Sequence, residues 1–212
     1  TPEQLAEVAE AAMRLDGVKH MIMTTGTINY FDMGVRYLAE CTRAIKAIVP
    51  DLAIQVQFEP PKELADMKLL KKAGAAAVGI HLESFSQKTR ERIAPGKAEI
   101  STSRYFEAFK YAVEIFGRNQ VTTYVIVGLG DSEESIVEGC RQVAEIGVYP
   151  FVVPLRPLMG TPLENVQAPD PVLMERIYQQ VAINNLKSGL NYRESKAGCA
   201  RCGACSGITA FE

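Results

Sequence analysis

Residues 54–59 read Ile54-Gln55-Val56-Gln57-Phe58-Glu59, and residues 78–83 read Val78-Gly79-Ile80-His81-Leu82-Glu83. In both stretches an apolar residue alternates with a polar or small one, which is the period of a β-strand with two unlike faces. An open parallel sheet is covered by helices on both faces, so its strands are apolar throughout. A barrel has helices on the outside only, and its inner face can carry polar residues around a ligand cavity. The alternation therefore favours a barrel or partial barrel with a polar interior, the lumen.

Helices and strands alternate along the chain, which predicts an α/β fold with a parallel sheet and helical crossovers. The first helix is expected to begin at Thr1-Pro2, a cap followed by proline, and to end at Gly17. Strands are predicted at residues 18–25, 52–58, 76–83, 121–127 and 151–155. Further helices are predicted at residues 32–48, 61–73, 102–116, 132–146 and 170–188, with a long connection at residues 84–101. Five strands are too few for an eight-stranded barrel, and the helical start suggests that a first strand precedes residue 1.

Composition excludes several classes of protein. The chain has 212 residues, enough for one domain with a sizeable core, and a formal net charge of −2. That charge offers no basic surface for nucleic acid or for a membrane. No apolar run reaches the roughly 18 residues that span a bilayer. Five cysteines, three of them clustered, fit a reducing cytoplasm better than a disulfide-linked secreted protein.

The clustered cysteines are Cys199, Cys202 and Cys205, spaced C-x2-C-x2-C near the C-terminus. Three thiolates at this spacing can converge on one metal centre. An auxiliary iron–sulfur cluster, a zinc site, a redox-active thiol pair and no metal at all remain open as interpretations, because the spacing does not choose the metal.

Three strand ends carry more specific motifs. They are Gly79-Ile80-His81-Leu82-Glu83-Ser84, then Tyr124-Val125-Ile126-Val127-Gly128-Leu129-Gly130-Asp131, and last Pro154-Leu155-Arg156-Pro157-Leu158-Met159-Gly160-Thr161-Pro162-Leu163. In this order and spacing they resemble the radical S-adenosylmethionine (SAM) enzymes, most closely the biotin synthase-like branch. The resemblance covers about residues 1–165. Residues 166–212 are expected to form a C-terminal helix and the cysteine-containing tail.

The resemblance implies a partial (β/α)6 TIM-like barrel, here without its first strand. It also implies a 4Fe-4S cluster that cleaves SAM to a 5′-deoxyadenosyl radical, which abstracts hydrogen from a small-molecule substrate. The expected electron donor is a protein such as flavodoxin or ferredoxin. A cytoplasmic transferase is expected, with no nucleic-acid or membrane partner, and homodimer formation at an open sheet edge. The cluster motif of the family, C-x3-C-x2-C, is absent from this chain, so the fragment is expected to be inactive alone.

The resemblance also implies roles for single residues. The loop Thr25-Gly26-Thr27 is expected at the methionine end of SAM, with His81 and Glu83 at its ribose. Contacts on the adenine side are expected from Ile126 and Gly128, and Leu155 is expected to contact the cofactor as well. Substrate contacts are expected from Gln55, Gln57, Tyr124 and Arg156.

Two other functional classes remain open at this point. One is a non-catalytic barrel or scaffold that holds zinc or an iron–sulfur cluster at its cysteine tail. The other is an ordinary barrel lyase or aldolase, which would need a catalytic lysine on an inward-facing strand position. None of the five predicted strands offers such a lysine.

Overall fold

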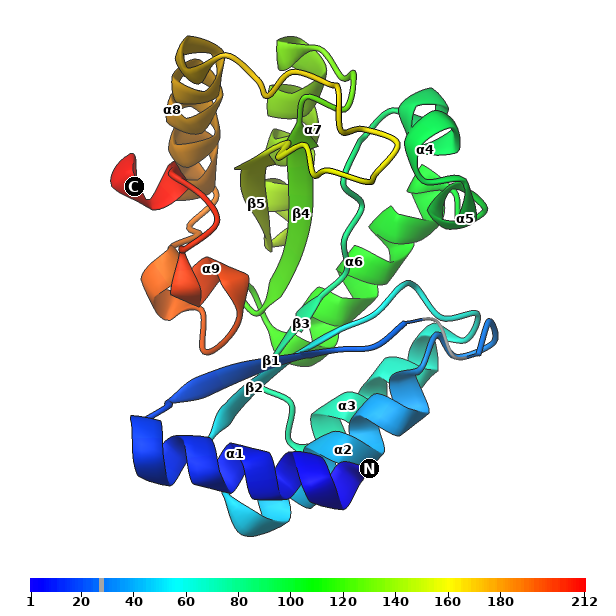
Figure 1. Ribbon diagram of the computed structural model, residues 1–212, viewed down its shortest axis with the longest axis vertical. Coiled ribbons are helices and arrows are strands. Elements are labelled where there is room, and N and C mark those ends of the chain that lie inside the picture. The colour runs from blue at the N-terminus through cyan, green and yellow to red at the C-terminus, as the bar shows by residue number, and fades with distance from the viewer. Residues whose placement is uncertain (27–28) are drawn as a thin grey trace.

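The computed structural model describes residues 1–26 and 29–212. Five parallel strands form one sheet in the order β1-β2-β3-β4-β5 (Figure 1). Their bounds are His20–Thr24, Ala53–Gln57, Ala77–Gly79, Val121–Val127 and Val148–Pro154. Because the spatial order of the strands follows the chain, every right-handed crossover places its helix on the same face of the sheet. The predicted α/β fold with a barrel-type parallel sheet is confirmed.

The main helices are α1 (Pro2–Asp16), α2 (Val35–Ile48), α3 (Met67–Ala73), α6 (Thr102–Phe116), α7 (Glu133–Ile146) and α8 (Pro171–Lys187). The start of α1 follows the prediction: the Thr1 hydroxyl accepts from the Gln4 N–H in a capping box, and Gly17 ends the helix at φ 65°. None of the helices in the described part of the chain is long and apolar enough to cross a membrane.

The segment predicted as a long connection, residues 84–101, contains two short helices, α4 (Gln87–Ile93) and α5 (Pro95–Ala98). A 3₁₀ turn, Leu64–Asp66, also precedes α3 within the predicted helix at 61–73. These elements are only one or two turns long, so they carry too little of a helical period to be recognised in the sequence.

Strand β3 is much shorter than predicted, because side chains replace part of its hydrogen-bond ladder with β4. The Leu82 N–H donates to Thr123 Oγ1 at 3.0 Å, and the Tyr124 N–H donates to His81 Nδ1 at 3.2 Å. Pairing then resumes as an isolated bridge between Glu83 and Val125. The strand is thus interrupted at the residues that carry the first family motif.

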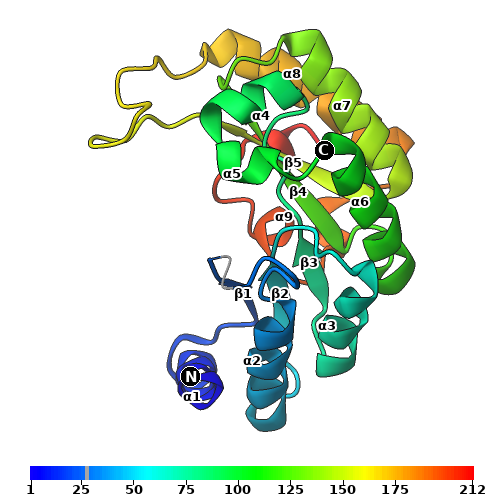
Figure 2. The ribbon, with the colours of Figure 1, turned by 90° about the vertical axis from the view of Figure 1, so that its right-hand side faces the viewer.

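The two faces of the sheet differ as the alternation predicted. Outward-facing residues such as Ile54, Val56, Val78 and Ile80 are fully buried in one cluster with residues of α2, α3 and α6. Figure 2 shows α3, α6 and α7 on one side of the strands and α9 (Cys199–Cys202) on the other. Burial of apolar side chains under the outer helices stabilises the sheet, at roughly 25 cal/mol per Å² removed from water.

The C-terminal segment after α8 turns back over the inner face of the sheet and covers part of the lumen. It contains two 3₁₀ turns, η2 (Tyr192–Glu194) and η3 (Ile208–Ala210), on either side of α9. Hydrogen bonds tie it to the sheet and its loops: the Gln120 side-chain amide donates to the Glu194 carbonyl, and the Ser206 hydroxyl donates to the Val152 carbonyl. The cysteine tail is therefore part of the barrel and is not an appended arm.

Candidate functional site

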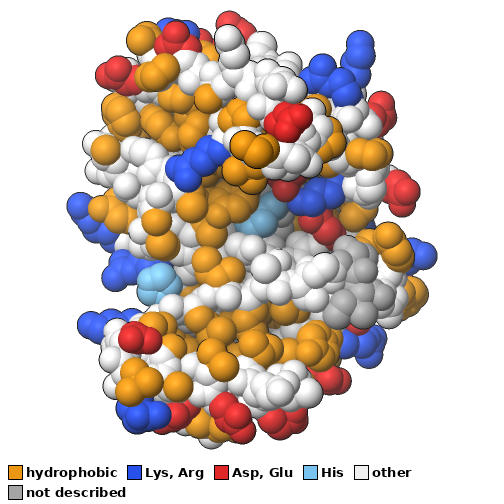
Figure 3. Space-filling model, in the orientation of Figure 1, with side chains coloured by type: hydrophobic (Ala, Val, Ile, Leu, Met, Phe, Trp, Pro, Cys, Tyr) orange, Lys and Arg blue, Asp and Glu red, His pale blue; other side chains and the backbone are white. Residues whose placement is uncertain are grey.

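A cavity of about 440 Å³ opens at the carboxyl ends of β1, β2 and β3. This is the end of a βα-barrel where active sites are built from loops that follow the strands. On the face drawn in Figure 3 the surface is hollowed across its middle, and acidic and basic side chains meet beside the hollow. The lining residues are Thr24, Thr25, Gly26, Tyr30, Met33, Gln57, Phe58, Glu59, His81, Gly96, Lys97, Glu99 and Ile100.

The end of β1 contributes backbone to this cavity. Thr25 and Gly26 both line it, and a Cβ placed on Gly26 would meet nothing within 4 Å. The glycine therefore leaves backbone accessible to a ligand. Thr27, also predicted to contact the cofactor, lies outside the described residues.

His81 lies in the lumen between β2 and β4. Its ring stacks on the Tyr124 ring with 4.4 Å between centroids. Because Nδ1 accepts from the Tyr124 N–H, the neutral ring carries its proton on Nε2. That Nε2 is buried and has no hydrogen-bond partner among the described residues. Burial, with a smaller effect of the Lys97 charge, lowers the pKa of His81 to about 3. His81 is therefore a neutral residue with one unused donor beside the cavity.

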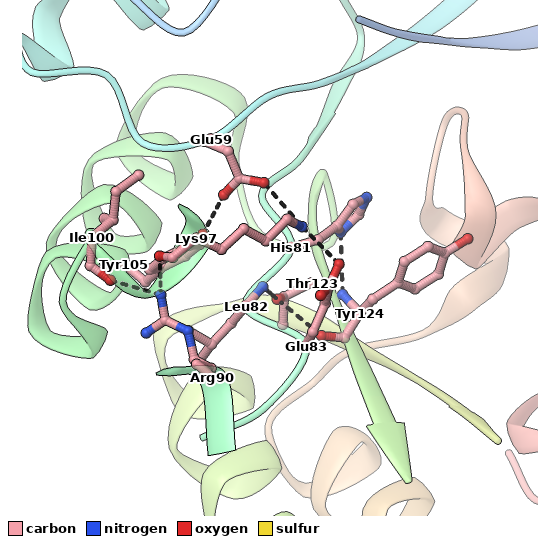
Figure 4. Close-up of polar contacts among 10 residues, drawn as sticks. All are labelled: Glu59, His81, Leu82, Glu83, Arg90, Lys97, Ile100, Tyr105, Thr123 and Tyr124. Atoms are coloured by element: carbon pink, nitrogen blue, oxygen red, sulfur yellow. Dashed lines mark hydrogen bonds and ion pairs between the residues drawn. The ribbon is translucent and has the colours of Figure 1, made fainter. Parts of the chain in front are cut away.

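Three charged side chains meet at the mouth of the cavity (Figure 4). Lys97 Nζ lies 3.0 Å from Glu59 Oε1 and 2.6 Å from Glu83 Oε1. Burial alone would lower the pKa of Lys97, but the carboxylates of Glu59 and Glu83 outweigh it and raise that pKa above its ordinary value. Glu83 has φ 67°, a left-handed conformation that is uncommon for residues other than glycine. Such strain often accompanies functional positions.

A second layer holds this charged group in place. The Tyr105 hydroxyl donates to Glu59 Oε2, and burial followed by the Glu59 charge raises the pKa of Tyr105, so the phenol stays protonated. The Arg90 guanidinium lies 4.7 Å from the centre of the Tyr105 ring. It donates to the carbonyl oxygens of Lys97 and Ile100, both at 2.6 Å. The turn that carries Lys97 is therefore fixed by hydrogen bonds from a buried arginine.

A second cavity, of about 310 Å³, lies under the cysteine tail. Its lining residues are Ile22, Gln57, Tyr124, Phe151, Cys199, Cys202, Ala204 and Cys205. The Tyr124 hydroxyl donates to Cys199 Sγ at 2.8 Å, while Cys202 and Cys205 are exposed. Among the residues that the structure describes, no three His, Cys, Asp or Glu side chains lie close enough together to hold a metal. The three predicted metal ligands thus share one cavity without forming an assembled site.

The remaining predicted residues are spread over several places. Gln57 lines both cavities. Gln55 lines neither: it is fully buried, donates to Thr122 Oγ1 at 3.0 Å and packs against Gly198 of the tail. The tail that covers Gln55 could not be placed from the sequence.

Three further residues expected to contact the cofactor, Ile126, Gly128 and Leu155, do not line the 440 Å³ cavity. A Cβ on Gly128 would lie 3.0 Å from Leu155 Cβ, so these two residues are neighbours just after the ends of β4 and β5. Ile126 lies two residues before Gly128, on β4. Arg156 is exposed and lines a separate surface groove with Pro154, Tyr178 and other residues. The structure therefore brings together Thr25, Gly26, His81 and Gln57, with Glu83 joined to them through Lys97.

Sequence reasoning missed Lys97 and Arg90 because both lie in the segment read as a connection. The dipeptide Pro95-Gly96 directly before Lys97 was the available signal, since it marks a turn that can bring a side chain back over the strand ends. Which strand end Lys97 would reach is a tertiary fact that no local pattern carries.

The family model described as the radical SAM superfamily matches residues 1–143. The chain belongs to the radical SAM superfamily. It is 27% identical over 187 residues to lipoyl synthase of Parabacteroides distasonis. The aligned region covers 86% of this chain and 63% of that protein. It is also 26% identical over 137 residues to bacteriochlorophyllide c C-7(1)-hydroxylase of Chlorobaculum limnaeum. Here the aligned region covers 64% of this chain and 34% of that protein.

Among solved structures, the archaeal Elp3 of Methanocaldococcus infernus with an N-terminal deletion superposes with a TM-score of 0.55 at 12% identity. That match covers 88% of this chain and 49% of the Elp3 chain, and it supports the fold described above. The chain spans between 34% and 63% of the length of the curated relatives it matches. The assignment of the chain to the biotin synthase-like branch of the superfamily stays a prediction.

Proposed function

We propose that this chain is the barrel of a radical SAM enzyme and that SAM binds in the 440 Å³ cavity. The observation that carries the proposal is the grouping of open glycine backbone, a neutral histidine and carboxylates at the barrel end that family members use. Glu59 and Glu99 line the cavity, whereas Lys97 is its only lysine or arginine among the described residues. A net acidic cavity suits SAM, whose sulfonium and ammonium are positive.

Each of these groups has a part in the proposed complex. The Glu83 carboxylate can accept hydrogen bonds from two ribose hydroxyls, and the neutral His81 ring forms part of the cavity wall. The backbone at Thr25 and Gly26 receives the methionine end. When bound, a 4Fe-4S cluster would supply the electron that cleaves SAM to a radical able to abstract hydrogen from a small molecule. The C-x3-C-x2-C motif for that cluster is not in this chain, so no residue of this chain is assigned as a ligand of that cluster.

SAM binding tests this proposal directly. Isothermal titration of the anaerobically purified protein is expected to show SAM binding, with Glu83→Gln weakening it about thirtyfold, because a hydrogen bond to a charged group is worth roughly 2 kcal/mol. Glu107→Gln, on the exposed side of α6, is the control and should bind as the wild type does. Absence of SAM binding by the wild type would contradict the proposal.

For the tail, we propose that Cys199, Cys202 and Cys205 rearrange to bind an auxiliary iron–sulfur cluster or zinc. The support is their shared cavity and their C-x2-C-x2-C spacing. Elemental analysis separates the alternatives: iron with sulfide indicates a cluster, and zinc alone indicates a structural site. Zinc without SAM binding would favour a non-catalytic metal-binding barrel. A small-molecule substrate, a flavodoxin- or ferredoxin-like electron donor and a cytoplasmic location belong to the same proposal.

A further inference from the structure

Two carboxylates converge on one ammonium at the mouth of the 440 Å³ cavity. Glu59 follows β2 and Glu83 follows β3, so neighbouring parallel strands deliver both to the same edge of the sheet. Their Oε1 atoms are each within hydrogen-bond distance of Lys97 Nζ. The two oxygens are thus no more than about 6 Å apart, a separation at which like charges disfavour each other's ionisation.

Lys97 is not a loosely held surface lysine. Its side chain is only 30% exposed, and the backbone of its turn is bonded by Arg90, which is itself 2% exposed. Arg90 has no carboxylate among its hydrogen-bond partners in the described residues; they are side-chain or carbonyl oxygens of Gln87, Lys97, Ile100 and Thr102. Burying an arginine without a direct counter-ion is costly. Here its contacts hold the Lys97 turn against the two strand ends.

We propose that Lys97 is a positioning residue, whose ammonium bridges Glu59 and Glu83 and offsets their mutual repulsion, so that they lie side by side as an acceptor pair for a positively charged, hydroxyl-bearing ligand. The identity of that ligand as SAM rests on the proposed function, whereas the state of the carboxylate pair does not. Tyr105 completes the arrangement from α6, because its hydroxyl occupies the Glu59 oxygen that Lys97 leaves free.

The titratable and charged groups that face the ammonium come from several elements. They are Glu59, His81, Glu83, Arg90, Glu99 and Tyr105. His81 is neutral, Tyr105 remains protonated, and Arg90 is a cation. Burial is the larger cause of the lowered pKa of His81, so after removal of Lys97 the carboxylates are the groups whose response to pH is followed.

Carbon-13 NMR of protein labelled at the glutamate carboxyls measures this response without any ligand. In Lys97→Met, the Glu59–Glu83 pair is expected to take up a proton at a pH about one unit or more above the wild-type value. Lys97→Arg should follow the wild type, and so should Lys88→Met, whose exposed side chain lies on α4 in the same segment. Signals are assigned with Glu59→Gln and Glu83→Gln.

A double variant separates charge repulsion from a general structural change. In Glu59→Gln/Lys97→Met only the Glu83 carboxylate of the pair remains. The pH at which it takes up a proton should therefore move back towards the wild-type value. Coincident curves for Lys97→Met and the wild type, or an equal shift in the double variant, would overturn the proposal. Lys97→Gln, which keeps much of the length and removes the charge, is measured in place of Lys97→Met if the methionine variant does not fold.

Ligand binding then connects the pair to the proposed function. Between pH 5 and pH 7, where the SAM ammonium stays protonated, the SAM affinity of the wild type is expected to be nearly flat, while that of Lys97→Met is weaker at pH 5 by about threefold and recovers as pH rises. An affinity ratio that does not change with pH would contradict the role of Lys97. If the wild type binds no SAM at any pH, the proposed function fails while the NMR result still decides the state of the carboxylate pair.

Discussion

The two cavities of the lumen share Gln57 but are built in different ways. The 440 Å³ cavity is formed by strand ends, and Glu59, Lys97 and Glu83 already contact one another there. The 310 Å³ cavity is closed by the C-terminal tail, and of its three cysteines only Cys199 is held by the lumen. Groups carried by neighbouring strands are positioned by the sheet itself, whereas groups on a tail depend on weaker docking contacts.

The largest effect is expected from the pH dependence of His81. Its pKa is lowered to about 3 in the folded protein, so the unfolded chain binds the proton more readily between about pH 3 and pH 6.5. The neutral histidine therefore contributes stability above pH 6.5, and this contribution is lost as pH falls, by up to about 1.4 kcal/mol per pH unit. The free energy of unfolding, measured with urea between pH 4 and pH 7, should depend less steeply on pH in His81→Gln than in the wild type. An equal dependence on pH in the two proteins would mean that His81 is not held neutral beside the 440 Å³ cavity.

The next largest effect concerns the docking of the tail. Gly198 has φ 96°, and a Cβ there would come within 2.1 Å of the Gln55 side chain. Gly198→Ala is therefore expected to cost about 3 kcal/mol, from backbone strain and from the clash. Gly160→Ala is the matched control, since Gly160 has φ 80° with nothing within 4 Å. Thermal unfolding and hydrogen exchange of residues 190–212 report the difference; equal losses in both variants would show that the tail does not need this contact.

A smaller effect is expected where side chains complete the sheet beside the first cavity. Thr123 is fully buried, and its Oγ1 accepts from the Leu82 N–H at 3.0 Å. Thr123→Val keeps the shape but leaves that N–H without a partner, at a cost of about 1.5 kcal/mol. Thr161→Val, in an exposed loop, should be neutral because water replaces its hydroxyl. Chemical denaturation compares the two, and an unchanged midpoint for Thr123→Val would argue against the interrupted ladder.

The smallest effect is expected at the contact between the two regions. Tyr124 stacks on His81 and donates to Cys199 Sγ. Tyr124→Phe keeps the stacking and removes the donor, so a loss of about 0.5 to 1 kcal/mol is expected, confined to the tail. Hydrogen exchange should increase at residues 196–206 and stay unchanged around His81. Increased exchange in both regions would show that the two cavities are coupled more closely than these contacts suggest.

Much of the fold was predictable because its signals are local. Ser101 and Ser132 cap α6 and α7 through their hydroxyls, and the helix at 102–116 and the strand at 121–127 have the predicted bounds. Strand β5 begins at Val148, three residues before the prediction, and β3 ends at Gly79, well before it. Both differences arise from pairing with β4, which a single strand sequence does not contain.

Within the candidate site, the sequence indicated the strand-end residues and missed the residues that act on them. His81 and Glu83 follow a readable motif, whereas Lys97 and Arg90 gain their roles from a turn folded over two strand ends. Gln55 illustrates the opposite error: the alternation correctly places it on the inner face, but the tail then buries it.

The alternation of helices and strands, the two unlike faces of the sheet and the family motifs can all be read from the amino-acid sequence alone. These depend on period, capping and residue type, which are properties of neighbours along the chain. The bridging of two carboxylates by Lys97, the entry of the tail into the lumen and the position of its three cysteines around one cavity are visible only in the folded protein. Those facts depend on which distant segments meet, because charge pairing and burial are set by distances in space and not by separation in sequence.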